Sequence, residues 1–201
     1  MQRDREKRTV DMRVIADWVE AKARVLDLGC GRGVLLDYLR VKKEVFGVGV
    51  DLSLEKVQAC VKKKVPVYHG DLLELMQSFP DQYFDRVICS RTVQELPSPK
   101  EVLEEALRVG KKVTVGFVNQ GFWKNRWRFV QTGNRMVNEV FPKPWYESHP
   151  TNPVSVGEFE EFCAAQRITI HRRVFLGGDW QKRVKVLPRL TCGYAIFDLS
   201  R

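Results

Sequence analysis

The sequence predicts one α/β domain built on a seven-stranded, mostly parallel sheet with a final antiparallel hairpin. At 201 residues the chain is long enough for one buried core and too short for two ordinary domains. Helical patterns alternate with short apolar runs through residues 10–118, which is typical of a parallel sheet covered by helices. Two β patterns then close the chain, and they predict the hairpin. We therefore treat residues 1–201 as a single domain.

The individual elements follow from the spacing of apolar residues. Residues 10–21 place Met12, Ile15, Ala16 and Val19 at helical spacing, so this segment is expected to be an amphipathic helix. Further helices are expected at 34–40, 54–63, 71–77 and 99–108, and strands at 24–28, 45–50, 65–69, 84–90, 112–118, 168–176 and 192–199.

The alternation stops after the fifth strand. Residues 119–153 are aromatic and basic and are interrupted by glycines and prolines, so we interpret them as an insertion with one helix at 123–131. An excursion of this length from a compact domain is usually functional. A helix resumes at Ser155, which has capping-box spacing to Glu158.

Composition favours a globular protein of a reducing compartment. Hydrophobic residues make up 44% of the chain, and charges interrupt every apolar run before it reaches the length of a membrane span. Residues 1–8 lack the apolar segment of a secretory signal. The five cysteines are scattered and form no CxxC pair, which argues against a zinc site or disulfides and favours small buried residues. We expect a cytoplasmic protein without a metal site.

The net charge of +9 suggests an anionic partner or, more simply, a solvated basic face. Residues 106–138 contain several lysines and arginines and no acid. With their interleaved aromatic residues they could form a platform for nucleic acid or for an acidic partner. Alternatively, Trp123, Trp127 and Val130 lie at helical spacing and form the buried face of the insertion helix. We favour burial of the aromatic residues and a partner for the cations.

The strongest local signal is the segment VLDLGCGRG at residues 25–33, where an apolar strand leads through an acid into a glycine-rich turn. Glycine lets the backbone turn sharply and lets a ligand approach without a Cβ in the way. Val34 stands where a dinucleotide-binding loop has its third glycine, and Asp27 suits the ammonium group of a methionine moiety better than a pyrophosphate. The loop therefore favours S-adenosylmethionine over NAD, the alternative being a tight turn without a ligand.

Two more acids follow the next two strands. Asp51 ends the second strand, 18 residues after Gly33, where an acid can bind both ribose hydroxyls. Asp71 follows the third strand, where a carboxylate can accept a hydrogen bond from the adenine amino group. Either acid alone is equally well explained as a helix N-cap. Together with Asp27, however, they share the carboxyl edge of the sheet, where ligands bind in this architecture.

The end of the fourth strand should flank the reacting group. Arg91 and Gln94 either orient a methyl acceptor or cap the next helix. Of the three histidines, His149 is the one considered for proton transfer. No general base stands out, and many methyl transfers need none, because alignment supplies most of the effect. The weak catalytic candidates are therefore Gln94 and His149.

With these motifs, the chain resembles the Rossmann-like class I S-adenosylmethionine-dependent methyltransferases. Within that superfamily it resembles the MetW family of methionine biosynthesis. The resemblance covers nearly the whole chain. The loop at 148–153 departs from the family pattern, on the acceptor side of the site. The MetW-like passages are 90–94, 107–112, 119–123, 145–147 and 158–163.

The resemblance implies a cofactor, a partner and a pathway. The cofactor is S-adenosylmethionine, with S-adenosylhomocysteine as its product, and the partner is homoserine O-acyltransferase. One alternative is a free-standing methyltransferase that acts on a small metabolite, and a weaker one is an RNA methyltransferase. The cofactor-binding candidates are Asp27, Gly29, Cys30, Gly31, Asp51, Leu52, Asp71, Leu72 and Ser90.

Overall fold

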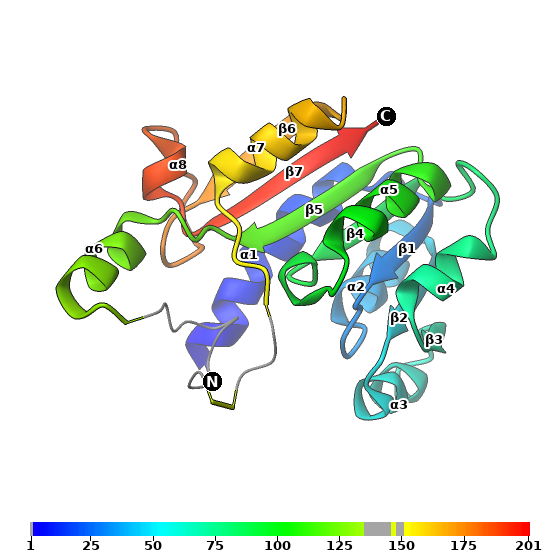
Figure 1. Cartoon of the computed structure of the whole chain (residues 1–201). Coiled ribbons are helices and arrows are strands. Elements are labelled where there is room, and N and C mark those ends of the chain that lie inside the picture. Colours follow the sequence, from blue (N-terminus) through cyan, green and yellow to red (C-terminus); the bar gives the residue numbers. More distant parts are fainter. Residues whose placement is uncertain (1, 135–145, 148–150) are drawn as a thin grey trace.

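The computed structural model describes residues 2–134, 146–147 and 151–201 (Figure 1). In this part of the chain, seven strands form one sheet in the order β3-β2-β1-β4-β5-β7-β6. Strands β1 to β5 are parallel, whereas β7 lies between β5 and β6 and is antiparallel to both. The predicted mostly parallel sheet with a final antiparallel hairpin is therefore confirmed.

The observed elements correspond closely to those expected. The largest difference is at α1, which begins near the start of the chain and ends at Trp18, and two short helices, η1 and α8, were not expected. The strands are β1 (Arg24–Leu28), β2 (Phe46–Asp51), β3 (Val67–His69), β4 (Arg86–Ser90), β5 (Val113–Val118), β6 (Thr169–Leu176) and β7 (Tyr194–Ser200). The helices are α1 (Gln2–Trp18), α2 (Val34–Lys43), α3 (Leu54–Lys62), α4 (Leu72–Gln77), η1 (Val93–Glu95), α5 (Pro99–Val109), α6 (Trp123–Thr132), α7 (Val156–Ala165) and α8 (Pro188–Thr191).

The sheet is buried on both faces, which explains why its central strands are mostly apolar. In β4, Val87 and Cys89 belong to one apolar cluster and Ile88 to the other, because successive side chains of a strand point to opposite faces. Leu103 of α5 packs in the first cluster and Leu36 of α2 in the second. Each face of the sheet therefore has its own helical cover.

The capping box that the sequence predicted at the start of α7 is confirmed. The Ser155 hydroxyl accepts a hydrogen bond from the Glu158 amide at 3.3 Å, and the Glu158 carboxylate accepts one from the Ser155 amide at 2.8 Å. These bonds favour the ionised carboxylate and lower the pKa of Glu158. The cap fixes the point at which the chain returns to the body after the insertion.

The expected burial of the insertion helix is wrong. In α6, the side chains of Trp123, Trp127 and Val130 are 45%, 58% and 75% exposed. Figure 1 shows the helix standing apart from those that cover the sheet. The physical reason is that α6 is attached through hydrogen bonds of Asn125 and Arg126 to its own connecting loop, and none of its residues is buried.

The strand order places a candidate site at one edge of the sheet. The chain runs outward from β1 through β2 to β3, and then crosses back to β4 on the other side of β1. The loops after β1 and β4 therefore diverge at the carboxyl edge, and ligands bind at such a switch point in open α/β sheets. Within residues 2–134 and 151–201, no helix is both long enough and apolar enough to cross a membrane.

Candidate cofactor site

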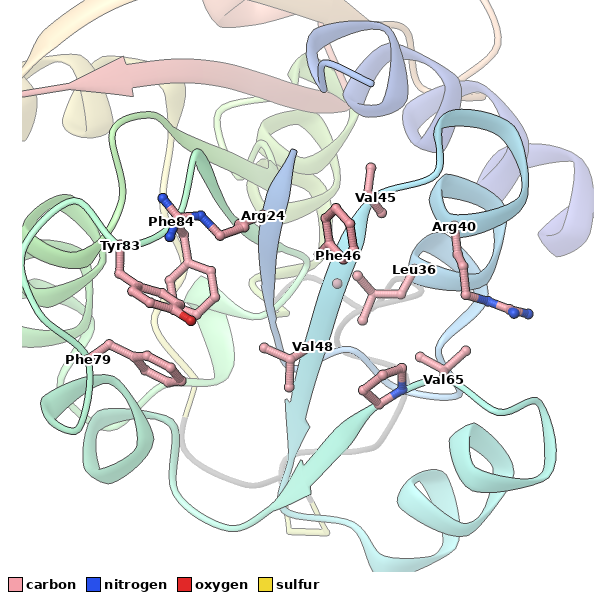
Figure 2. Close-up of a pocket in the computed structure, with 12 residues that line it drawn as sticks. Arg24, Leu36, Arg40, Val45, Phe46, Val48, Val65, Phe79, Tyr83 and Phe84 are labelled. Carbon is pink, nitrogen blue, oxygen red and sulfur yellow. The ribbon is translucent and has the colours of Figure 1, made fainter. Parts of the chain in front are cut away.

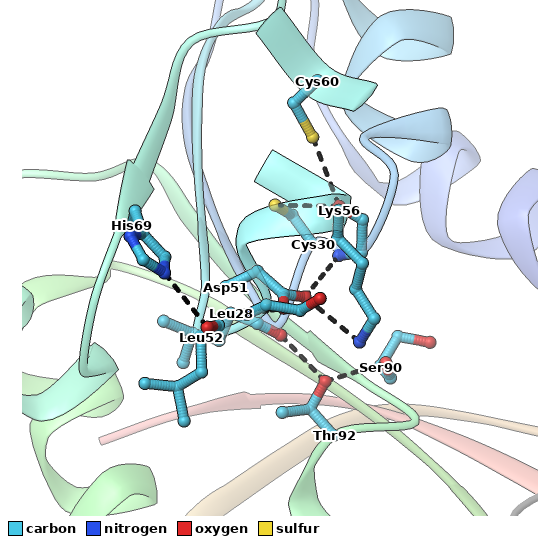
Figure 3. A network of polar contacts seen from close by, with 11 residues as sticks. Leu28, Cys30, Asp51, Leu52, Lys56, Cys60, His69, Ser90 and Thr92 are labelled. Atoms are coloured by element: carbon cyan, nitrogen blue, oxygen red, sulfur yellow. Dashed lines mark hydrogen bonds and ion pairs between the residues drawn. The ribbon is translucent and has the colours of Figure 1, made fainter. Parts of the chain in front are cut away.

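The glycine-rich loop after β1 is held tightly between its neighbours (Figure 3). The amides of Gly29 and Cys30 both donate to the Val50 carbonyl of β2, at 2.9 and 3.0 Å. Thr92, in the loop after β4, donates its hydroxyl to the Leu28 carbonyl at 2.9 Å. A Cβ added to Gly29, which has φ +69°, would lie 2.4 Å from the Thr92 hydroxyl oxygen. Glycine is therefore required at this position by the fold itself.

Gly31 needs to be glycine for a different reason. Its φ of +57° is in the left-handed region, yet an added Cβ would meet nothing within 4 Å. The Gly31 amide donates to the Asp51 carboxylate at 2.9 Å, which fixes the loop beside β2. The space next to Gly31 is thus open, and its backbone is rigidly placed. A ligand can approach the main chain closely here.

Asp27 is a buried acid with no compensating donor. Its side chain is 5% exposed, and within the described residues no group donates a hydrogen bond to its carboxylate. Burial, and then the negative charge of Asp51, raise the pKa of Asp27 to about 7. Burying an ionised carboxylate is costly unless a cation or hydrogen bonds accompany it. This position therefore suits a positively charged group of a ligand.

Asp51 organises the loops on its side of the site. Its carboxylate accepts the amides of Gly31 and Ser53, each at 2.9 Å, and Lys56 of α3 lies 3.5 Å away. Figure 3 shows Lys56 reaching towards Asp51. Each carboxylate oxygen has more than one acceptor site, so Asp51 retains capacity for hydroxyl groups. The side chain is only 7% exposed, which favours direct contact with a bound ligand over contact with bulk water.

Asp71 is the N-cap of α4, as the alternative interpretation of this residue allowed. One oxygen, Oδ1, accepts the amides of both Leu73 and Glu74, at 2.8 and 3.2 Å. Leu72 is half-buried, whereas Leu52, directly after Asp51, is 71% exposed. An exposed leucine at the edge of a loop is well suited to cover the flat face of a purine.

The end of β4 carries a hydroxyl pair that the sequence did not reveal. The Ser90 hydroxyl lies 2.9 Å from the Tyr194 hydroxyl of β7. A Cβ added to Gly116 would lie 2.4 Å from that tyrosine oxygen, so glycine in β5 makes room for the pair. Burial raises the pKa of Tyr194, which keeps this phenol protonated. No local motif marks Tyr194, because its place depends on the insertion of β7 beside β5.

Arg91 caps no helix. It has φ +64°, and its Nε and Nη2 atoms donate to the Asp11 carboxylate of α1 at 3.0 and 2.6 Å. Its guanidinium also lies 4.7 Å from the ring centre of Trp180. Because of its bonds to Asp11, Arg91 ties α1 to the end of β4. The positive φ is a strained conformation, which persists where such contacts hold the residue, often at functional sites.

Gln94, one of the two catalytic candidates, is held by the main chain. It is fully buried, its side-chain Nε2 donates to the Val118 carbonyl at 3.2 Å, and its Oε1 accepts the Val118 amide at 3.0 Å. Both ends of the side-chain amide are thus bonded to the end of β5, which favours a structural role. The other catalytic candidate, His149, lies outside the described residues.

A separate apolar groove of about 620 Å³ lies at the opposite edge of the sheet (Figure 2). It surrounds the start of β2 and contains none of the three acids. The groove is lined mainly by apolar and aromatic side chains, including Leu36, Val45, Phe46, Val48, Phe79 and Tyr83.

The cysteines are all buried, as expected. Within the described residues, no cluster of histidine, cysteine or acidic side chains could hold a metal ion.

Comparison with known families decides the relationship. A model of the family described as "Methionine biosynthesis protein MetW" matches residues 9–199. The chain belongs to the MetW family. It is 27% identical over 203 residues to the bifunctional methionine biosynthesis protein MetXA/MetW of Rhodopirellula baltica, a match that covers 96% of this chain and 33% of that protein. This MetW chain therefore corresponds to about a third of its bifunctional relative.

Further relatives carry methyltransferase names. The chain is 29% identical over 142 residues to a ubiquinone biosynthesis O-methyltransferase of Dechloromonas aromatica, covering 63% of this chain and 59% of that enzyme. An S-adenosylmethionine-dependent methyltransferase from Archaeoglobus fulgidus superposes with a TM-score of 0.68 at 20% identity, covering 99% of this chain and 94% of that one. A similar enzyme from Aquifex aeolicus gives 0.61 at 17% identity, with coverage of 96% and 90%. The MetW chain thus has the fold of the S-adenosylmethionine-dependent methyltransferases.

Proposed function

We propose that this MetW chain is an S-adenosylmethionine-dependent methyltransferase-type protein that acts in methionine biosynthesis together with homoserine O-acyltransferase. The observation that carries the cofactor assignment is Asp27, a buried acid to which no described residue donates a hydrogen bond, beside the open loop at Gly31. An ammonium group placed there would neutralise the acid. The methionine part of the cofactor has such a group.

The remaining candidate residues have complementary roles in this proposal. Asp51 accepts the two ribose hydroxyls, and Asp71 uses its second oxygen for the adenine amino group while its first caps α4. Leu52 and Leu72 flank the purine. Gly29, Cys30 and Gly31 present main chain to the methionine moiety, and Ser90 lies towards the reacting end.

The chemistry of the bound cofactor is simple. Its sulfonium supplies a methyl group that is activated towards a nucleophile. The residues of this chain bind and orient the cofactor, and the main contribution of such a site is alignment of the reacting atoms. Tyr194 and Ser90 shape the floor on the acceptor side, and the raised pKa of Tyr194 argues against its use as a base.

The assignment to methionine biosynthesis is supported by the MetW family match and by the bifunctional relative from Rhodopirellula baltica. That protein is named for both MetXA, which we take as the homoserine acyltransferase, and MetW, so the two are fused in one polypeptide there. Two proteins that occur fused in one organism commonly work together when separate. This supports the acyltransferase as the partner of the present chain.

The second candidate is a free-standing methyltransferase that acts on a small metabolite. It is favoured by the intact cofactor loop, because a pure scaffold has no need for a buried, uncompensated Asp27. The similarity to ubiquinone O-methyltransferases points in the same direction. An RNA methyltransferase is supported by the net charge of +9 and by the basic residues of 106–138.

Calorimetric titration with S-adenosylmethionine and with S-adenosylhomocysteine tests the cofactor assignment. We expect saturable binding of both, weakened about tenfold or more by Asp27→Asn, because the ammonium loses its charged partner. Folded protein that binds neither molecule would refute it. Repeating the titration with the acyltransferase and candidate acceptors separates the two metabolic candidates, since a free-standing enzyme transfers methyl groups without the partner.

A further inference from the structure

The insertion helix α6 presents an apolar stripe to solvent. Trp123, Trp127 and Val130 are spaced at i, i+4 and i+7, so they lie on one face of the helix, and all three are exposed. An amphipathic helix normally turns such a stripe towards the core. Contiguous exposed apolar surface of this kind is typical of an interaction site.

The attachment of α6 explains the orientation of this stripe. Asn125, the least exposed residue of the helix, donates to the Asn119 carbonyl at 3.3 Å, and the Arg126 Nε donates to the Gly121 carbonyl at 2.9 Å. These bonds attach α6 to its own connecting loop, and every residue of the helix other than Asn125 is exposed. The apolar stripe is therefore open to solvent.

The base of the helix is firmly held. Asn119 is completely buried, and its side chain donates to the Cys192 carbonyl at 2.9 Å and accepts the amides of Gly121 and Val156 at 2.9 and 3.2 Å. One residue thus connects the end of β5, the start of α7 and the chain leading to β7. The outward face of α6 is consequently a preorganised surface, and preorganisation lowers the entropic cost of binding.

The charges beside the stripe indicate the kind of partner. Lys124 and Arg128 lie along one side of it and Arg126 along the other, and residues 106–134 contain no acid. Two copies of this helix packed face to face would bring like charges together, which opposes self-association. An apolar centre with a charged rim is the usual anatomy of a protein–protein interface, in which tryptophan and arginine dominate the binding energy. The complementary surface is an apolar pocket surrounded by acidic side chains.

We propose that the outward face of α6, formed by Trp123, Trp127 and Val130 with its flanking cations, is the docking surface for homoserine O-acyltransferase. This assignment rests on the proposed function for the identity of the partner. The aromatic residues provide the buried centre of the contact, and the cations mainly speed association with an acidic surface.

Binding of the full chain to the acyltransferase of the same organism, measured by surface plasmon resonance, tests this proposal. Trp127→Ala should raise Kd by about tenfold or more, as expected of an interface hot spot. Phe46→Ala is the control, because Phe46 is also an exposed aromatic residue, at 70% against 58% for Trp127, but lies at the amino edge of the sheet. A second matched pair is Val130→Ala against Val61→Ala of α3. Both control variants should bind within about twofold of wild type, since surface substitutions outside an interface have small effects.

The charge contribution is tested separately. Lys124→Glu combined with Arg128→Glu should slow association and reduce its dependence on salt. S-adenosylmethionine affinity should stay unchanged in every variant, which shows that the cofactor site is intact.

Each result has a definite meaning. A complex that Trp127→Ala leaves as tight as wild type overturns the docking surface while the proposed partner stands. Absence of any complex between the wild-type chain and the acyltransferase overturns both the docking surface and the proposed partner. Cofactor binding is tested separately by the calorimetric titration. Loss of RNA binding or of self-association in Trp127→Ala, with acyltransferase binding unaffected, assigns the surface to another occupant and also overturns the proposal.

Discussion

Asp27 and Asp51, which lie near the ends of neighbouring parallel strands, are electrostatically coupled. Burial, and then the charge of Asp51, raise the pKa of Asp27 to about 7. Asp51 is compensated by two main-chain amides and by Lys56, whereas Asp27 has no donor within the described residues. Asp51 is therefore compensated by neighbouring groups to a greater extent than Asp27. This difference is the reason that we propose Asp27, and not Asp51, for the cationic group of the cofactor.

The coupling predicts a pH-dependent stability of the cofactor-free protein. The folded pKa of Asp27, about 7, is above the ordinary aspartate value of 3.8, so between these values the native state binds more protons than the unfolded state. Stability should therefore fall as the pH rises from about 4 to about 7, and Asp27→Asn should remove this part of the decrease. Urea unfolding at several pH values measures it. Asp17→Asn, an exposed acid on α1, is the control and should behave as wild type.

Cofactor binding should release protons near pH 6.5. An ammonium group beside Asp27 favours the ionised carboxylate and lowers its pKa, so part of the Asp27 population loses a proton on binding. Calorimetric titrations in buffers of different ionisation enthalpy measure the number released. Asp27→Asn should abolish the release. Equal proton release in the variant and in wild type would show that another group is responsible.

Replacement of Asp51 should weaken the binding of both S-adenosylmethionine and S-adenosylhomocysteine, because the two share the ribose. We expect a loss of about tenfold or more for Asp51→Ala, as buried hydroxyls lose their acceptor. Lys56→Gln is the control for the local charge, since Lys56 forms an ion pair with Asp51, and it should cost much less. A folded Asp51→Ala variant with unchanged affinity would refute the ribose assignment.

RNA binding, if it occurs, has a distinctive dependence on salt. Contacts to phosphates release counterions, so affinity falls steeply with ionic strength, with a slope set by the number of contacts. We expect no specific RNA binding, and at most weak binding at low salt that disappears at physiological salt. Tight binding with a steep slope would favour the RNA methyltransferase over both metabolic candidates.

The sequence was sufficient for the parts of the site that depend on local pattern. The alternation of helical and strand patterns predicted the sheet. The acid and glycines at 27–33 predicted the loop, because strand, turn and helix follow one another directly in that segment. The contacts made across long sequence separations were not predictable. Arg91 binds Asp11, 80 residues earlier, and Ser90 meets Tyr194, 104 residues later.

The orientation of α6 shows a second limit of sequence analysis. The spacing of Trp123, Trp127 and Val130 correctly indicates one apolar face on a helix. It contains no information on whether that face meets the body of the same molecule or another protein. Only the bonds of Asn125 and Arg126 to the connecting loop decide this. The hydrogen bonds of Gln94 to Val118 were equally unpredictable from the sequence, because they depend on the packing of η1 against β5.

The glycines of the loop allow the fold and the ligand site to be tested separately. Gly29→Ala should destabilise the protein strongly, because its Cβ would lie 2.4 Å from the Thr92 hydroxyl oxygen in addition to the strain of a positive φ. Gly31→Ala should cost only about 1–2 kcal/mol, the ordinary penalty of the left-handed region, because its Cβ enters open space. Gly133, at the end of α6, has the same combination of positive φ and open space and is far from the acids in sequence.

Gly133→Ala is therefore the matched control for Gly31→Ala. Both variants should lose similar stability in thermal unfolding, since the backbone strain is the same. Only Gly31→Ala should lose S-adenosylmethionine affinity, by about tenfold or more, because its methyl group occupies the space through which the cofactor approaches the main chain. Equal affinity of the Gly31→Ala and Gly133→Ala variants would place the cofactor elsewhere on the sheet edge. A Gly29→Ala variant as stable as Gly31→Ala would show that Thr92 moves aside, and that the loops after β1 and β4 are not rigidly packed together.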